Sequence, residues 1–140
     1  MYQKDYILRM IEMLGDLLAA IFGLIKKGDH MKASEQLSKI YYNMLKEDAA
    51  FFRAIPAEDL THKLMKEHNY TNGHLEILAE LFYAEAELEI TQGHKSDSLE
   101  YLEKSLLLFE FIDREQKTLI PRRLEKMDAI RNRINEIQLG

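Results

Sequence analysis

The 140-residue sequence contains no cysteine and no tryptophan. Without cysteine, the chain has no disulfide, no thiolate nucleophile and no cysteine-ligated zinc. Its two prolines and six glycines are too few for the many tight turns of an all-β domain. No segment alternates apolar and polar residues with the period of two that marks a half-buried strand. We therefore expect no strands.

Net positive charge and long apolar runs are also lacking. The formal net charge is −5 at pH 7, which argues against a protein that binds nucleic acid over its whole surface. The uncharged run 17–25 is about half the length that crosses a bilayer. Charges throughout the first 13 residues argue against a cleavable secretion signal. We expect a cytoplasmic protein with no cofactor and with neither nucleic-acid nor membrane partners.

The patterns that are present are helical. Apolar residues make up 46% of the chain and charged residues 31%, which favours one folded domain over residues 1–140. The apolar spacing predicts a helical hairpin over about 5–46, a connector with a short helix over 47–70, a second hairpin over about 74–114 and a last helix over about 121–138. Gly28 and Gly93 suit the left-handed residue after a helix, and Pro121 suits a first helical turn.

Beside one narrow stripe of charged residues, the first helix is apolar around more than half of its remaining circumference, so it must be covered from two or more sides. It is either the central helix of the domain or part of a dimer interface. Gly15, Ala19 and Gly23 follow one another at four-residue spacing. A glycine inside a helix costs about 0.8–1.0 kcal/mol relative to alanine, so we predict that another helix crosses closely here. Tolerated glycine on an exposed face is the alternative.

Two stretches, "GDHMKASEQLSKI" and "GHKSDSLEYLEKS", resemble the turn and second helix of a tetratricopeptide repeat. The matching positions are Gly28, Ala33 and Leu37 in the first stretch and Gly93, Ser98, Leu102 and Ser105 in the second. Ile40 stands where the motif has a small residue, and the two stretches lie 65 rather than 34 residues apart. The chain is also similar to small uncharacterised bacterial helical proteins that are grouped as a domain of unknown function.

The tetratricopeptide resemblance implies an all-α fold of about five to seven helices. Antiparallel hairpins would form a right-handed stack, closed by a C-terminal capping helix, with a groove for a protein or peptide. The residues expected at close helix-packing positions are Ala33, Leu37, Ser98, Leu102 and Ser105.

Glu85 and Glu89 lie one helical turn apart among apolar residues of the helix predicted over 74–91. A buried carboxylate needs a partner, and three hypotheses remain open. Basic residues of this chain pair with them, for which Arg9, Arg131 and Arg133 are available; they line a groove for a basic ligand or peptide; or they bind a metal ion. A two-metal bundle would also need a Glu-x-x-His pair, and none occurs.

Catalytic motifs are missing: no serine or threonine has a nucleophile-elbow context, and there is no glycine-rich phosphate loop. We expect a non-enzymatic protein- or peptide-binding module. The alternative is a small-molecule or metal-binding helical protein with a pocket near Glu85 and Glu89.

Two further features bear on partners. The basic residues of the last helix are expected to pack on the acidic helices before it, although an RNA or lipid surface is an alternative. Leu107 and Phe111 lie in a polar arc of their helix, so the last helix or a partner covers them. Together with the first helix, they predict a homodimer. The candidates for a partner groove are Phe82, Glu85, Glu89, Leu107 and Phe111.

Overall fold

The computed structural model describes residues 2–117 and 120–140, and within these ranges the chain is helical with no strand. The prediction of an all-α fold is confirmed. None of the described helices combines the length and apolar character needed to cross a bilayer. The elements are α1 (Tyr2–Lys27), α2 (His30–Ile40), the π-helical turn η1 (Tyr41–Leu45), α3 (Ala49–Ala54), the 3-10 turn η2 (Ala57–Asp59), α4 (Leu60–Glu67), α5 (Asn72–Thr91), α6 (Lys95–Gln116) and α7 (Pro121–Leu139).

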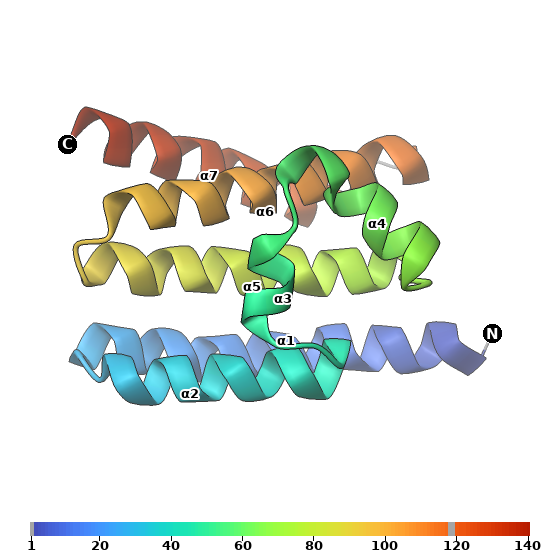
Figure 1. Ribbon diagram of the computed structural model, residues 1–140, viewed down its shortest axis with the longest axis horizontal. Helices are drawn as coiled ribbons and strands as arrows, with labels where there is room; N and C mark the ends of the chain where they lie inside the picture. The colour runs from blue at the N-terminus through green and yellow to red at the C-terminus, as the bar shows by residue number, and fades with distance from the viewer. Residues whose placement is uncertain (1, 118–119) are drawn as a thin grey trace.

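The long helices run side by side (Figure 1), with α5 in the middle. α5 packs against α1, α2, η1 and α6, and α7 packs against α6. The interpretation of the first helix as the central one is therefore wrong. Although Leu14, Leu18 and Ile21 of α1 are buried, Leu8, Met13 and Leu17 are exposed. In α5, by contrast, buried side chains point in several directions: Leu75, Ile77, Leu78, Ala79, Leu81, Phe82, Ala84, Ala86 and Leu88.

The turns follow local rules that are visible in the sequence. Gly28 and Gly93 both adopt positive φ, +85° and +83°, as glycine after a helix does. The Asp29 carboxylate accepts a hydrogen bond from the Lys32 backbone N–H, and Thr71 and His74 form a capping box at the start of α5. These caps fix where α2 and α5 begin.

Small residues bring α5 and α6 close together. Ser98 donates a hydrogen bond to the Ala86 carbonyl (2.8 Å), and Ser105 donates one to the Ala79 carbonyl (2.7 Å). Both serines are fully buried, and so are Ala33, Leu37 and Leu102.

The predicted helix crossing at Gly15, Ala19 and Gly23 does not occur within the described chain. All three residues are exposed. Around a Cβ built at Gly15 or Gly23, there is nothing within 4 Å apart from the helix's own backbone and the adjacent residues. Periodicity shows that a helix face is small, but it cannot show whether another helix reaches it. Close approach occurs instead at Gly73 of α5, where an added Cβ would overlap with Cγ2 of Ile7.

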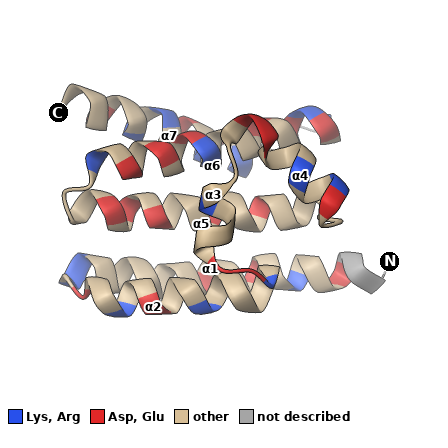
Figure 2. Ribbon diagram, viewed as in Figure 1, with Lys and Arg blue, Asp and Glu red and all other residues tan. Residues whose placement is uncertain are grey.

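Ion pairs hold α7 against α5 and α6, and Figure 2 shows the acidic residues that these two helices carry. The expectation that the basic last helix packs on the acidic helices is confirmed. Its cations approach carboxylates as follows: Arg123 to Glu76 (3.2 Å) and Asp113 (3.0 Å), Lys126 to Glu80 (3.2 Å), Arg131 to Glu110 (3.1 Å) and Arg133 to Glu87 (2.9 Å).

Candidate functional site

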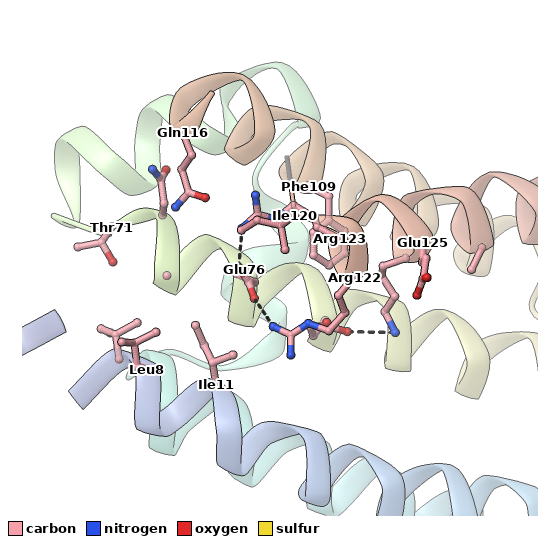
Figure 3. A pocket seen from close by; sticks show the side chains of 16 residues that line it. Leu8, Ile11, Thr71, Glu76, Phe109, Gln116, Ile120, Arg122, Arg123 and Glu125 are labelled. Atoms are coloured by element: carbon pink, nitrogen blue, oxygen red, sulfur yellow. Dashed lines mark hydrogen bonds and ion pairs between the residues drawn. The ribbon is translucent and has the colours of Figure 1, made fainter. Parts of the chain in front are cut away.

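A groove with a cavity volume of about 890 Å³ lies between α1 and α7, over the first half of α5. In Figure 3, Leu8 and Ile11 approach it from α1, Glu76 lies on its floor, and Arg122 and Arg123 approach from α7. One wall is thus apolar and the other is charged. Besides those five, its lining residues include Ile7, Thr71, Asn72, Gly73, Glu80, Phe109, Gln116, Ile120, Glu125, Lys126 and Ala129.

The carboxylates on the floor already have cationic partners. Glu76 contacts Arg123 and lies 3.9 Å from Arg122, while Glu80 pairs with Lys126. Burial raises the pKa of Glu80 above its ordinary value, and the charge of Lys126 opposes that rise. A ligand in the groove therefore need not bring positive charge to balance the carboxylates of Glu76 and Glu80. The Arg122 side chain is 81% exposed, which makes it available to an anionic group.

Glu85 and Glu89 lie on the opposite side of α5 from this floor. Glu89 Oε2 is 2.9 Å from His94 Nδ1. Within the described residues, Glu85 makes no hydrogen bond or ion pair. Burial first, and the neighbouring charge of Glu89 second, raise the pKa of Glu85 to about 7, while Arg53 acts in the opposite direction. Near neutral pH this carboxyl group is therefore divided between its charged and neutral forms.

The arginines that the sequence offered as partners do not pair with Glu85 and Glu89, so this part of the prediction is wrong. Arg131 and Arg133 extend to Glu110 and Glu87 instead, and Arg9 is exposed.

Sequence reasoning missed four neighbours of Glu85 and Glu89. Arg53 Nη2 of α3 lies 2.5 Å from Asp97 Oδ1, and its guanidinium carbon is 5.2 Å from the ring centre of Tyr101. The Tyr41 hydroxyl is buried without a hydrogen-bond partner in the described chain. Burial and then the charge of Glu85 raise the pKa of both Tyr41 and Tyr101. Because Arg53 comes from a segment with the pattern of a connector, no local signal placed it here.

Three potential metal ligands meet beside Glu85. Glu89, His94 and Asp97 each offer one ligand atom, and these atoms lie within 4.8 Å of one another. Two carboxylates and an imidazole suit Zn²⁺ or Mn²⁺. In the structure, however, Glu89 bonds to His94 and Asp97 to Arg53, so an ion would have to replace both contacts.

The other predicted groove residues lie elsewhere. Phe82 is fully buried and cannot touch a partner. Leu107 and Phe111 are half-buried, and Phe111 packs against the core. None of the five predicted residues lines the groove between α1 and α7. The sequence shows the apolar wall of this groove only as part of the wide apolar surface of α1, with nothing that marks it as a separate site.

No protein-family model matches the chain, and comparison with curated proteins and with solved structures gives no match.

Proposed function

We propose that this chain is a non-enzymatic module that binds a helical segment of a partner protein in the groove between α1 and α7. The observation that carries the proposal is the groove itself, about 890 Å³ in volume and bounded on two sides by long helices. An amphipathic helix that lies between two helices and above a third is a recurring mode of peptide recognition.

The two walls define the chemistry of that segment. Ile7, Leu8 and Ile11 favour an apolar face on the partner helix, since burying apolar surface yields about 25 cal/mol per Å². Arg122 favours an acidic residue on the opposite edge, because its guanidinium is exposed and pairs readily with carboxylates. The partner is therefore an amphipathic helix with an acidic edge.

We also propose a fold type and a cellular location for this module. We assign the α1–α2 and α5–α6 hairpins to a tetratricopeptide-like stack with α7 as its cap, acting in the cytoplasm. The antiparallel hairpins, the positive-φ glycines at their turns and the buried serines of α6 support this assignment.

A photo-reactive benzophenone amino acid placed at Leu8, and separately at Ala129, tests the groove. These positions lie on opposite walls, so one bound helix should cross-link to both when the full chain is irradiated in its own cells. Ser34, exposed on α2, is the control position. We expect the same partner protein at Leu8 and Ala129, none at Ser34, and a lower yield with Arg122→Glu. The absence of a cross-link on both walls would overturn the proposal, and so would a product that contains only further copies of this chain.

A second candidate function is divalent-metal binding at Glu89, His94 and Asp97, which the 4.8 Å grouping of their ligand atoms favours. Titration calorimetry with Zn²⁺ and Mn²⁺ tests it on the purified chain. Stoichiometric binding that is lost in His94→Ala, and kept in the control His62→Ala, supports the metal site. Heat that is equal in the two variants excludes it.

A further inference from the structure

One edge of α1 carries a continuous row of apolar side chains, and the rest of the chain leaves all of them except the buried Met10 at least partly in solvent. Tyr6 is 54% exposed, Met13 58% and Leu17 38%. Together with Met10, Ala20 and Leu24, they recur at alternating spacings of four and three residues, the repeat of a coiled-coil seam. We call this set the α1 seam. From Tyr6 to Leu24 it extends about 27 Å, at 1.5 Å per residue.

The groove does not use this seam. Leu8 lies in the groove wall, whereas Met13 is five residues further on and so points about 140° away around the helix. α2 and α5 pack against α1, yet they leave the seam's largest side chains exposed. An exposed apolar row of this kind marks an interaction surface.

We propose that a second copy of this chain docks its own α1 seam antiparallel against this one. The pattern is self-complementary about Gly15. Tyr6 and Leu24 are equally far from Gly15 along the chain, as are Met13 and Leu17. A two-fold axis that crosses the seam at the level of Gly15, on the opposite side of α1 from that residue, therefore places Tyr6 opposite the second copy's Leu24 and Met13 opposite its Leu17, and repeats both contacts by symmetry.

Charge complementarity selects the antiparallel arrangement. Asp5 and Lys27 flank the two ends of the seam on the same side of α1. Both are exposed, and neither forms an ion pair within the described chain. Antiparallel docking brings Asp5 of each copy near Lys27 of the other, whereas parallel docking would bring like charges together.

A single helix pair of this length buries less than the roughly 1,200–2,000 Å² of a standard stable interface. The dimer is therefore weak, with a Kd on the order of micromolar. Because the groove lies on another side of α1, the dimer is independent of the proposed binding function, and each can fail alone.

Sedimentation equilibrium of the full chain at about 100 µM tests the assembly. We expect twice the 16.5 kDa of one chain for the native sequence and one chain's mass for Met13→Asp. The matched control is Leu8→Asp, which alters an apolar residue of similar exposure (51%) on the groove side and should stay dimeric. Circular dichroism verifies that both variants remain helical. A monomeric native chain, or a Met13→Asp dimer, would overturn the proposal.

Engineered thiols test the orientation without weakening the seam. Since the chain has no cysteine, every disulfide must come from the introduced residues. A mixture of Met13→Cys and Leu17→Cys chains should form the mixed disulfide several-fold faster than either chain alone forms its own. Faster self-pairing of Met13→Cys would indicate a parallel dimer and contradict the antiparallel assignment.

Discussion

Arg123 of α7 and Glu76 of α5 lie 3.2 Å apart, Nη2 to Oε1, although 47 residues separate them. The Arg123 side chain is only 7% exposed. Its Nη1 lies 3.0 Å from Asp113 on α6, so one buried guanidinium ties α7 to both inner helices. Removing a buried cation leaves its carboxylates without compensation, which costs far more than losing a surface pair.

We expect Arg123→Met to lower the free energy of unfolding by about 2–4 kcal/mol, because Glu76 and Asp113 stay largely buried. The adjacent Arg122→Met is the matched control. Arg122 is 81% exposed and 3.9 Å from Glu76, so its loss should cost less than about 1 kcal/mol. Urea denaturation at neutral pH measures both. Equal losses in the two variants would contradict the bridging role of Arg123.

The sequence predicts the features that depend on residues close together along the chain, and it does not predict those that depend on how distant helices pack. The second hairpin, predicted over about 74–114, is observed as α5 (Asn72–Thr91) and α6 (Lys95–Gln116), because apolar period and capping are local properties. By contrast, nothing local distinguishes Arg123 from Arg122, since burial depends on where α5 and α6 lie. The same holds for the groove, which exists only because α1 and α7 flank α5. The apolar excess of α1 was visible, but whether this chain or another covers it was not.

Glu85 should make stability depend on pH in the direction opposite to a salt-bridged carboxylate. Its pKa in the folded chain is about 7 against an ordinary 4.5, so between these values the folded state binds a proton that the unfolded state has released. The contribution of Glu85 to the free energy of unfolding is greatest below pH 4.5. It falls as the pH rises from 4.5 to 7 and is lost above pH 7. At about 1.36 kcal/mol per pKa unit, the full cost is about 3 kcal/mol.

We therefore expect Glu85→Gln to be more stable than the native chain at pH 8, with a difference that shrinks to near zero at pH 4. Urea midpoints taken between pH 4 and 8 give the profile. The control Glu103→Gln, at an exposed position of α6, should follow the native profile. A Glu85→Gln advantage that does not change with pH would show that burial does not act on this carboxyl group.

The buried Tyr41 and the half-buried Tyr70 should respond differently to loss of the hydroxyl group. The Tyr70 hydroxyl donates a hydrogen bond to the Leu45 carbonyl at 2.6 Å, whereas the Tyr41 hydroxyl is buried without a partner in the described chain. Tyr70→Phe should destabilise by about 1 kcal/mol. Tyr41→Phe should be neutral or stabilise by up to about 2 kcal/mol, because it removes an unsatisfied polar group. Thermal unfolding ranks the pair, and a larger loss for Tyr41→Phe would mean that its hydroxyl has a partner.

Glycine replacements separate an open helix face from a crowded one. Gly15 has open space where a Cβ would lie, so Gly15→Ala should stabilise α1 by about 0.8–1.0 kcal/mol through helix propensity. At Gly73, the added methyl would meet Cγ2 of Ile7. Such overpacking typically costs about 1–3 kcal/mol, and Gly73→Ala should destabilise the chain and loosen the end of the groove where α1 meets α5. Urea denaturation at two protein concentrations measures both. Destabilisation by Gly15→Ala that grows with concentration would place a second copy on this face of α1 rather than on the seam.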